Sequence, residues 1–310
     1  MERREADRRE VGQREADQRE AGQREAGQRE ADQREADQRE ADQREADQRE
    51  ADQREAEQLL MYALGVERAW LYAHGDDLVD VAAADRFRVL IARRAAGEPF
   101  AYITGQREFF SLDLAVTPAV LIPRPETELL VELALAKIAQ DERVDIADLG
   151  TGSGAIALAL AQARPNARLR ATDASAAALQ VARDNAERLG IRNIEFAQGD
   201  WCAALDDARF DLIVSNPPYI AVGDAHLAQG DLRFEPAAAL ASGADGLDAI
   251  RTISRDAPMH LKPGGWLLFE HGYDQGAAVR ALLQQNGYVE VSTALDLEQR
   301  DRVSSGRVRH

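Results

Sequence analysis

Four short segments carry residue types that could bind a ligand or assist a reaction, and each one follows a short apolar run. Residues 216–219 read Asn-Pro-Pro-Tyr directly after the run FDLIVS. The Asn216 side-chain oxygen and the Pro217 carbonyl are hydrogen-bond acceptors, and two proline rings restrict the backbone that carries them. This pair can hold an NH2 group by its two hydrogens and direct its nitrogen at an electrophile. The segment therefore predicts a substrate-binding site at Asn216, Pro217, Pro218 and Tyr219, with Asn216, Pro217 and Tyr219 as catalytic residues and the Tyr219 ring packed on the flat face of that group.

A turn with glycines at alternate positions follows the apolar run VDIADL. Such glycines let the backbone turn tightly and approach a ligand closely, and the helix that begins beside them presents free backbone amides. Asp173 ends the next apolar run. It follows the glycine turn at close to the ~20-residue offset that is usual for a carboxylate that binds ribose hydroxyls. The turn is neither a G-x-G-x-x-G pattern nor a P-loop, so we expect no pyrophosphate or nucleoside triphosphate. Its residues are Gly150, Thr151, Gly152, Ser153 and Gly154.

Asp200 and Trp201 follow a third apolar run, IEFAQ. A carboxylate can accept a hydrogen bond from an adenine amino group, and an indole can cover the adenine face. Together with the glycine turn and Asp173, these two residues predict a site for a nucleoside-containing cofactor. The expected cofactor-binding residues are Gly150, Thr151, Gly152, Ser153, Gly154, Asp173, Asp200, Trp201 and Asn216.

The elements that must position these segments alternate between short strands and helices. The predicted strands are the apolar runs 144–148, 168–173, 194–198, 210–215 and 265–270. The predicted helices between them are 154–164, 174–190 and 246–261. Such alternation predicts an α/β fold with a mostly parallel sheet that helices cover on both faces, and residues 287–310 read as two strands of an antiparallel edge. Since ligands bind outside the carboxyl ends of parallel strands, we expect the four segments to share one edge of the sheet.

The first 56 residues form a low-complexity charged repeat of five residues, Q-R-E-A-D or Q-R-E-A-G. Five residues advance a helix by about 500°, so the alanines spiral instead of forming an apolar stripe. The repeat does offer Glu-to-Arg pairs at i, i+4, such as Glu15 with Arg19 and Glu30 with Arg34. We expect an exposed helix or a disordered segment without a packing partner; a tether or interaction arm is the alternative.

Three further segments divide the rest of the chain. Helical spacing of apolar residues predicts a small helical domain over residues 57–104. Residues 105–124 alternate like a hairpin and end in a linker, and residues 125–310 hold the predicted sheet. The boundary lies at a stiff turn, Pro123 to Glu128, that starts the next helix.

The composition excludes several classes of protein. The formal net charge of −17 disfavours a broad electrostatic grip on nucleic acid, which depends on Lys and Arg neutralising phosphates. The longest apolar stretch, Ala155 to Ala161, is far shorter than the ~20 residues that a membrane span needs. The charged start carries neither a secretory signal nor a transit peptide, and the lone Cys202 excludes an internal disulfide. From the missing membrane span and targeting signal we expect a cytoplasmic protein. The histidines show no paired metal-ligand spacing, so we expect no metal.

These motifs resemble those of the class I S-adenosylmethionine-dependent methyltransferases, in which NPPY after the fourth strand marks enzymes that methylate planar amide or amino nitrogens. More closely, the chain resembles the PrmC/HemK family of release factor glutamine methyltransferases. The resemblance runs from about Glu55 to Arg307. It rests on EAEQLL, GEPFAYITGQREFFSL, LIPRPETE, DLGTGSGAIALALA, GDW, IVSNPPYI, GDLRFEP, LKPGGWLLFEHG and RVSSGR.

The resemblance implies a Rossmann-like methyltransferase domain preceded by a helical substrate-docking domain. It implies methyl transfer from S-adenosylmethionine to the side-chain amide nitrogen of the glutamine in the GGQ motif of class I peptide chain release factors. In that case Gly150 to Gly154 line the methionine end of the cofactor, Asp173 holds its ribose, Trp201 lies by its adenine, and Asn216 to Tyr219 bind the glutamine. We expect a monomer that contacts neither membrane nor nucleic acid. The charged repeat departs from the family, whose members have a first helix of mixed composition.

Two other functions are compatible with parts of this pattern. An NPPY pocket suits the exocyclic amino group of adenine in DNA or RNA equally well, although LIPRPETE and GDLRFEP belong to the glutamine enzymes. A scaffold with a silent methyltransferase domain is the third hypothesis, which the intact set of motifs disfavours. The roles of four charged loop residues stay open between structure and substrate contact: Arg124, Glu126, Arg233 and Glu235.

Overall fold

The computed structural model describes residues 33–35, 37–40, 42–43 and 45–309. These residues form two compact units, one ending at Ile91 and one beginning at Ala92. Within the described ranges, helices that are both long and apolar enough to span a bilayer are absent. The predicted limits of the helical domain and of the hairpin segment stay predictions.

The described part of the charged repeat is helical, and this helix continues to residue 64, where Gly65 takes a left-handed conformation with φ of 69°. Its Glu-to-Arg pairs follow the predicted i, i+4 spacing. Because both partners are exposed, each pair stabilises the helix by only ~0.3–0.5 kcal/mol. The pairs are Glu35–Arg39 at 2.5 Å, Glu45–Arg49 at 2.7 Å and Glu50–Arg54 at 2.5 Å. The predicted pairs Glu15–Arg19 and Glu30–Arg34 each include at least one residue outside the described ranges.

Helices α2 (Arg68–Ala73) and α3 (Val81–Ala95) follow this first helix. Among the described residues of the first unit, the buried apolar ones are Leu59 and Ala63 of the first helix and Ala83 and Leu90 of α3, whereas α2 has no buried residue. The side chain of Asp80 accepts hydrogen bonds from the first backbone amides of α3, which explains where that helix starts. Arg86 Nε donates to the Ala63 carbonyl at 3.1 Å and fastens α3 to the first helix.

After the last residues of α3, the second unit has a short helix and a two-stranded antiparallel hairpin, followed by a sheet that has seven strands within the described residues. The sheet order is β5-β4-β3-β6-β7-β9-β8. Strands β3 to β7 are parallel, and β9 runs antiparallel to both of its neighbours. This arrangement confirms the predicted mostly parallel sheet with an antiparallel edge. The strands are β1 (Gln106–Phe109), β2 (Leu112–Ala115), β3 (Asp145–Leu149), β4 (Arg168–Asp173), β5 (Ile194–Gln198), β6 (Phe210–Ser215), β7 (Leu261–Glu270), β8 (Val289–Leu295) and β9 (Asp301–Arg307).

Helices connect these strands, and several short 3-10 helices lie in the loops. The α-helices of the second unit after α3 are α4 (Phe100–Thr104), α5 (Glu128–Leu135), α6 (Ala155–Ala163), α7 (Ala176–Leu189), α8 (Ala237–Leu240), α9 (Asp248–Asp256) and α10 (Gly276–Gln285). The 3-10 helices are η1 (Pro125–Thr127), η2 (Trp201–Leu205), η3 (Ala225–Ala228), η4 (Gly230–Phe234) and η5 (Ala257–His260). The predicted helix after Pro123 thus begins as a 3-10 turn and becomes α-helical at Glu128.

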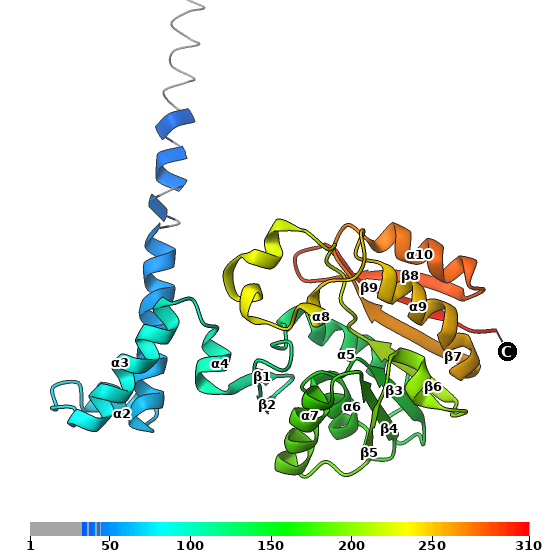
Figure 1. Ribbon diagram of the computed structural model, residues 1–310, viewed down its shortest axis with the longest axis horizontal. Helices are drawn as coiled ribbons and strands as arrows, with labels where there is room; N and C mark the ends of the chain where they lie inside the picture. The colour runs from blue at the N-terminus through cyan, green and yellow to red at the C-terminus, as the bar shows by residue number, and fades with distance from the viewer. Residues whose placement is uncertain (1–32, 36, 41, 44, 310) are drawn as a thin grey trace, which may run out of the picture. The chain divides into compact units, whose positions relative to one another are not determined.

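The central strands are buried on both faces, which explains their nearly continuous apolar sequences. Alternate residues of β3 enter different cores: Ile146 packs with the layer that holds α5 and α6, whereas Ala147 packs with the layer that holds α9 and α10. Figure 1 shows these two helix layers on opposite sides of the sheet.

The strand order brings the predicted functional segments together. Strand β3 lies between β4 and β6, so the chain leaves β3 towards one side of the sheet and later returns to its other side. The loops after these three strands therefore diverge at one edge and leave a crevice, which is where ligands bind in open α/β sheets.

Candidate active site

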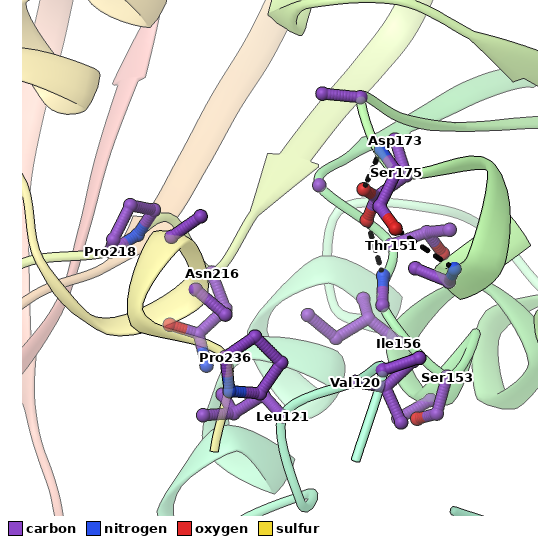
Figure 2. A pocket seen from close by; sticks show the side chains of 18 of the residues that line it. Val120, Leu121, Thr151, Ser153, Ile156, Asp173, Ser175, Asn216, Pro218 and Pro236 are labelled. Atoms are coloured by element: carbon purple, nitrogen blue, oxygen red, sulfur yellow. Dashed lines mark hydrogen bonds between the residues drawn. The ribbon is translucent and has the colours of Figure 1, made fainter. Parts of the chain in front are cut away.

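A cavity of about 370 Å³ opens at the carboxyl ends of β3, β4 and β6. Its volume falls within the range of about 300–1,000 Å³ that is usual for small-molecule sites. Figure 2 shows Asn216 and Asp173 on opposite sides of it, with the apolar side chain of Ile156 between them. Val120 and Leu121, which precede the Pro123 turn, and Pro236 from the loop before α8 also line the cavity in this view. The cavity is therefore mostly apolar, with polar groups gathered at its two ends.

The glycine turn between β3 and α6 approaches the cavity with its backbone. Gly150, Gly152 and Gly154 have φ angles of 74°, 55° and 87°, which a residue with a side chain rarely adopts. A Cβ atom placed on Gly152 would have no protein atom within 4 Å, and Gly152 lines the cavity. Open space for a ligand therefore lies directly against this part of the backbone.

Asp173 is held at the end of β4 by two backbone amides. The Gly152 amide donates to Asp173 Oδ2 at 2.9 Å, and the Ser175 amide donates to Oδ1 at 2.8 Å. Each carboxylate oxygen can accept a further hydrogen bond, and the residue is only partly buried beside the cavity. Asp173 therefore keeps acceptor capacity beside the cavity, and its contact with a ribose diol stays a prediction.

Trp201 lies against the glycine turn. A Cβ atom on Gly150 would be 3.1 Å from Trp201 Cζ3, so only glycine lets the indole pack this closely over the turn. Trp201 has a φ of 44°, an unusual value for a bulky residue that indicates local strain. Both Trp201 and its neighbour Asp200 line the cavity, as do Thr151 and Ser153.

Asp148, directly before the glycine turn, was missed as a candidate residue although it stands beside the motif in the sequence. It is almost completely buried, and Thr151 Oγ1 donates to its Oδ2 at 2.6 Å. Its Oδ1 is buried and has no hydrogen-bond partner among the described residues. Burial raises the pKa of Asp148 to about 7, against the opposing effect of the Thr151 hydrogen bond.

The Asn-Pro-Pro-Tyr segment leaves β6 at the other end of the cavity. Asn216 Nδ2 donates to Thr127 Oγ1 at 3.1 Å, which leaves the Asn216 side-chain oxygen free to accept. Asn216 and Pro218 belong to the cavity lining, whereas Pro217 is buried. The Tyr219 hydroxyl donates to Glu270 Oε1 at 3.2 Å, at the end of β7. Among the described residues, neither Pro217 nor Tyr219 lines this cavity, so the proposed packing of the Tyr219 ring on a substrate group stays a prediction.

Hydrogen bonds and ion pairs show structural contacts for some of the charged loop residues whose roles the sequence left open. Arg124, which lines the cavity, forms an ion pair with Glu235, and the Ile122 amide donates to the same carboxylate at 3.2 Å. Glu235 is buried, and both of its oxygens are used within the protein, so it fastens the LIPRPETE and GDLRFEP segments to each other. Arg233 donates to the Ala96 carbonyl at 2.9 Å, which is also a structural contact.

Comparisons with known proteins first define the class. Residues 126–243 match the model of the methyltransferase small domain, and residues 38–105 match that of the PrmC N-terminal domain. The second match begins inside the charged repeat. A methyltransferase from Pyrococcus furiosus has the same fold, with a TM-score of 0.50 at 18% identity over 71% of this chain and 98% of the other. The second unit thus contains a methyltransferase domain.

Curated relatives define the family more closely. The release factor glutamine methyltransferase of Xylella fastidiosa strain Temecula1 is 57% identical over 249 residues, which cover 80% of this chain and 90% of the relative. The protein of the same description from Burkholderia pseudomallei is 52% identical over 256 residues, 81% of this chain and 90% of the relative. The chain belongs to the release factor glutamine methyltransferase family.

Membership of this family implies S-adenosylmethionine as the cofactor, and the residues of the cavity fit it. Asp173 offers free acceptor positions for a ribose diol, and the Trp201 indole and the apolar lining suit a planar base. The open space against Gly152 admits the part of a ligand that must approach the backbone closely. The predicted cofactor-binding residues Gly150 to Gly154, Asp173, Asp200, Trp201 and Asn216 all line this one cavity, apart from Gly154, which lies at the start of α6.

Proposed function

We propose that this chain transfers a methyl group from S-adenosylmethionine to the side-chain amide nitrogen of the glutamine in the GGQ motif of class I peptide chain release factors. The observation that carries the proposal is the orientation of Asn216. Because its NH2 group donates to Thr127, its oxygen is the atom left to receive a substrate N–H. This acceptor lies across the cavity from Asp173, the residue suited to a cofactor ribose (Figure 2).

The task of the protein is to make a poor nucleophile react. The lone pair of an amide nitrogen is delocalised into its carbonyl, so the nitrogen must be held in line with the electrophile. In this proposal the Asn216 oxygen, which lines the cavity, accepts one N–H hydrogen and fixes the direction of the nitrogen, and the carbonyl of the neighbouring Pro217 stays the predicted acceptor for the second. Positive charge develops on that nitrogen as its new bond forms, so both hydrogen bonds strengthen toward the transition state.

The rigidity of this acceptor pair comes from the fold around it. Two prolines restrict the backbone after Asn216, and the Ile220 amide donates to the Leu240 carbonyl at 3.0 Å, which holds the segment beside α8. Holding both reactants in one geometry contributes several kcal/mol, up to about 7–11 in favourable cases.

The chemistry requires no group from the protein to bond covalently with the methyl carbon. S-adenosylmethionine, when bound, supplies a methyl group activated by a positively charged sulfur, which keeps the electron pair of the broken bond and becomes a neutral thioether. The glutamine nitrogen gives its lone pair to the new N–C bond and releases one proton to water. No metal is needed for this exchange.

We also propose that the helical region before the sheet docks the release factor. Several large apolar side chains of this region are exposed, which suits contact with a protein. They include Tyr62, Trp70, Tyr72, Leu78 and Val81. We propose that the enzyme works as a monomer in the cytoplasm and binds no nucleic acid directly, in keeping with its formal charge of −17.

Replacing Asn216 with alanine tests the proposal. We expect turnover with release factor to fall by about 100-fold or more, because one preorganised hydrogen-bonding group is lost. Binding of S-adenosylmethionine should change little, since the glycine turn and Asp173 remain. Asn166→Ala, which removes an exposed amide, is the matched control. Near-normal turnover by Asn216→Ala, or labelled methyl incorporated into DNA or RNA instead of release factor, would contradict the assignment.

A further inference from the structure

The wall of the active-site cavity carries few charges. Among the described residues that line it, the charged ones are Arg124 in the turn before η1, Asp173 at the end of β4 and Asp200 after β5. The rest of the wall is apolar or neutral. An anionic group that enters the cavity therefore meets Arg124 as the one cationic side chain of the wall, within the part of the chain that the structure describes.

The backbone around Arg124 is stiff. Pro123 and Pro125 stand on either side of it, and a residue before a proline is restricted to an extended conformation. Arg124 has φ of −100° and ψ of 144°, in agreement with that restriction. Pro123 and Thr127 also line the cavity, and Thr127 Oγ1 accepts from Asn216 Nδ2. The segment that carries Arg124 thus belongs to the Asn216 end of the cavity.

A buried carboxylate holds the Arg124 side chain. Arg124 Nη2 donates to Glu235 Oε1, and the Glu235 side chain is completely buried. The Ile122 amide donates to the other carboxylate oxygen, Oε2, at 3.2 Å, so Glu235 is itself fixed. Pro236, the next residue, lines the cavity. The Arg124 guanidinium is therefore held in place at the cavity wall by the protein alone.

This guanidinium keeps donors for a second acceptor. Arginine has five N–H groups in a fixed fork. Within the described residues, the bond to Glu235 is the only hydrogen bond of the Arg124 guanidinium, and it uses Nη2. The Arg124 side chain is 31% exposed, so its other donors are not sealed inside the protein. Arg124 can thus bind a ligand and keep its bond to Glu235.

S-adenosylmethionine carries a suitable acceptor. Its methionine part ends in a carboxylate, which is ionised at neutral pH. Placing this charge against an apolar wall is costly unless the charge is paired and hydrogen-bonded. Asp173 and Asp200 repel a carboxylate, whereas Arg124 attracts it.

We propose that Arg124 is a cofactor-binding residue that pairs with the methionine carboxylate of S-adenosylmethionine, and that Glu235 is the residue that positions Arg124. An arginine can meet a carboxylate with two parallel N–H bonds, which gives the attraction a direction. Arg124 thereby distinguishes S-adenosylmethionine from nucleosides that lack the carboxylate. This inference rests on the cofactor of the proposed function and is independent of its protein substrate.

Binding of two ligands to variants of the full-length chain tests the inference. Calorimetry gives the Kd of S-adenosylmethionine and that of decarboxylated S-adenosylmethionine, which keeps the adenosine, the sulfonium and the amine but lacks the carboxylate. Arg124→Gln removes the positive charge, whereas Arg124→Lys keeps it. Arg192→Gln makes the same change of charge at an exposed residue before β5, outside the cavity wall, and serves as the control.

We expect Arg124→Gln to weaken the binding of S-adenosylmethionine by about 10- to 150-fold, which corresponds to the loss of a hydrogen bond between charged groups. The Kd of the decarboxylated ligand should stay near that of the unaltered protein or fall, because this ligand has no carboxylate to pair. Arg124→Lys should lose less affinity for S-adenosylmethionine than Arg124→Gln. Arg192→Gln should bind both ligands like the unaltered protein.

A second variant covers the case in which Arg124→Gln does not fold. Loss of Arg124 leaves the buried Glu235 carboxylate without its cationic partner, which destabilises a protein. The double variant Arg124→Gln/Glu235→Gln removes both charges. It should show the same selective loss, with weaker binding of S-adenosylmethionine and near-normal binding of the decarboxylated ligand. Thermal unfolding without ligand shows which variants are folded before calorimetry.

Several results would overturn the inference. They are an unchanged Kd of S-adenosylmethionine in the folded Arg124 variant, equal losses for the two ligands, and a loss of the same size in Arg192→Gln. A normal Kd of S-adenosylmethionine together with a raised KM for release factor would assign Arg124 to the protein substrate instead. The calorimetry contains no release factor, so failure of this inference leaves the proposed substrate standing, and an unmethylated release factor leaves this inference standing.

Discussion

The close approach of the glycine turn to the cofactor can be tested by adding a single methyl group. Gly152→Ala places a Cβ atom where no protein atom lies within 4 Å, so the change creates no clash within the protein. Two effects remain. The left-handed backbone, with φ of 55°, costs an alanine about 1–2 kcal/mol of stability. The added methyl group also occupies ligand space, and overfilling a packed site typically costs about 1–3 kcal/mol, which corresponds to about 5- to 150-fold weaker cofactor binding.

Gly105→Ala separates these two effects. Gly105 follows α4, has a φ of 72° and would also place its Cβ in open space, but it lies outside the cavity lining. Both variants should lose similar stability in chemical denaturation, whereas calorimetry should show weaker binding of S-adenosylmethionine only for Gly152→Ala. Equal cofactor affinity in the two variants would refute the argument that this turn lies against the ligand.

Two further predictions concern buried polar groups around the same turn. Because the pKa of Asp148 is raised to about 7 in the folded protein, the folded state keeps a proton that the unfolded chain releases between about pH 4 and 7. The free energy of unfolding therefore falls as pH rises through that window, by up to about 1.4 kcal/mol per pH unit. In urea denaturation, the stability of Asp148→Asn relative to the unaltered protein should increase from pH 5 to pH 7. A difference that stays constant over this range would contradict the raised pKa. Asn185 is fully buried and bonds the Ala115 amide at 2.7 Å and the Ser153 carbonyl at 2.9 Å. Asn185→Ala should cost about 2–4 kcal/mol of unfolding free energy, against less than about 0.5 for the exposed Asn166→Ala, and equal losses would show that these bonds contribute little.

Much of the fold could be predicted because its signals are local. The runs that became β3, β4, β5, β6 and β7 are short, apolar and separated by helical spacing, which is the pattern of strands buried on both faces. The place of the glycine turn and Asp173 at one edge also followed from the sequence, since parallel neighbouring strands bring their carboxyl ends to the same edge; the hydrogen bond between them did not.

The contacts of Asn216 with Thr127 and of Tyr219 with Glu270 could not be predicted in the same way. Glu270 reads as the polar end of one more apolar run, and Thr127 reads as part of a helix start. These two contacts depend on β7 lying beside β6 and on the position of η1, which are properties of the assembled domain. The motif also does not show that the Tyr219 hydroxyl donates to Glu270, because a sequence motif gives only residue types.

The environment of Asp148 is another feature that the sequence does not reveal. Its position before the turn was visible, but the sequence alone does not indicate that one carboxylate oxygen would be buried without a partner. The ion pair of Arg124 with Glu235 joins residues that are 111 positions apart, so no local pattern could have shown that Glu235 is structural.

The central claim is that this site methylates one glutamine side chain in a release factor. The most direct measurement is mass spectrometry of a class I release factor after incubation with the full-length enzyme and S-adenosylmethionine, beside a release factor in which the GGQ glutamine is replaced by alanine. The account predicts a single added methyl group on that glutamine and none on the substituted protein. An unmodified glutamine in the presence of active, cofactor-bound enzyme, or a methyl group on another residue, would contradict it.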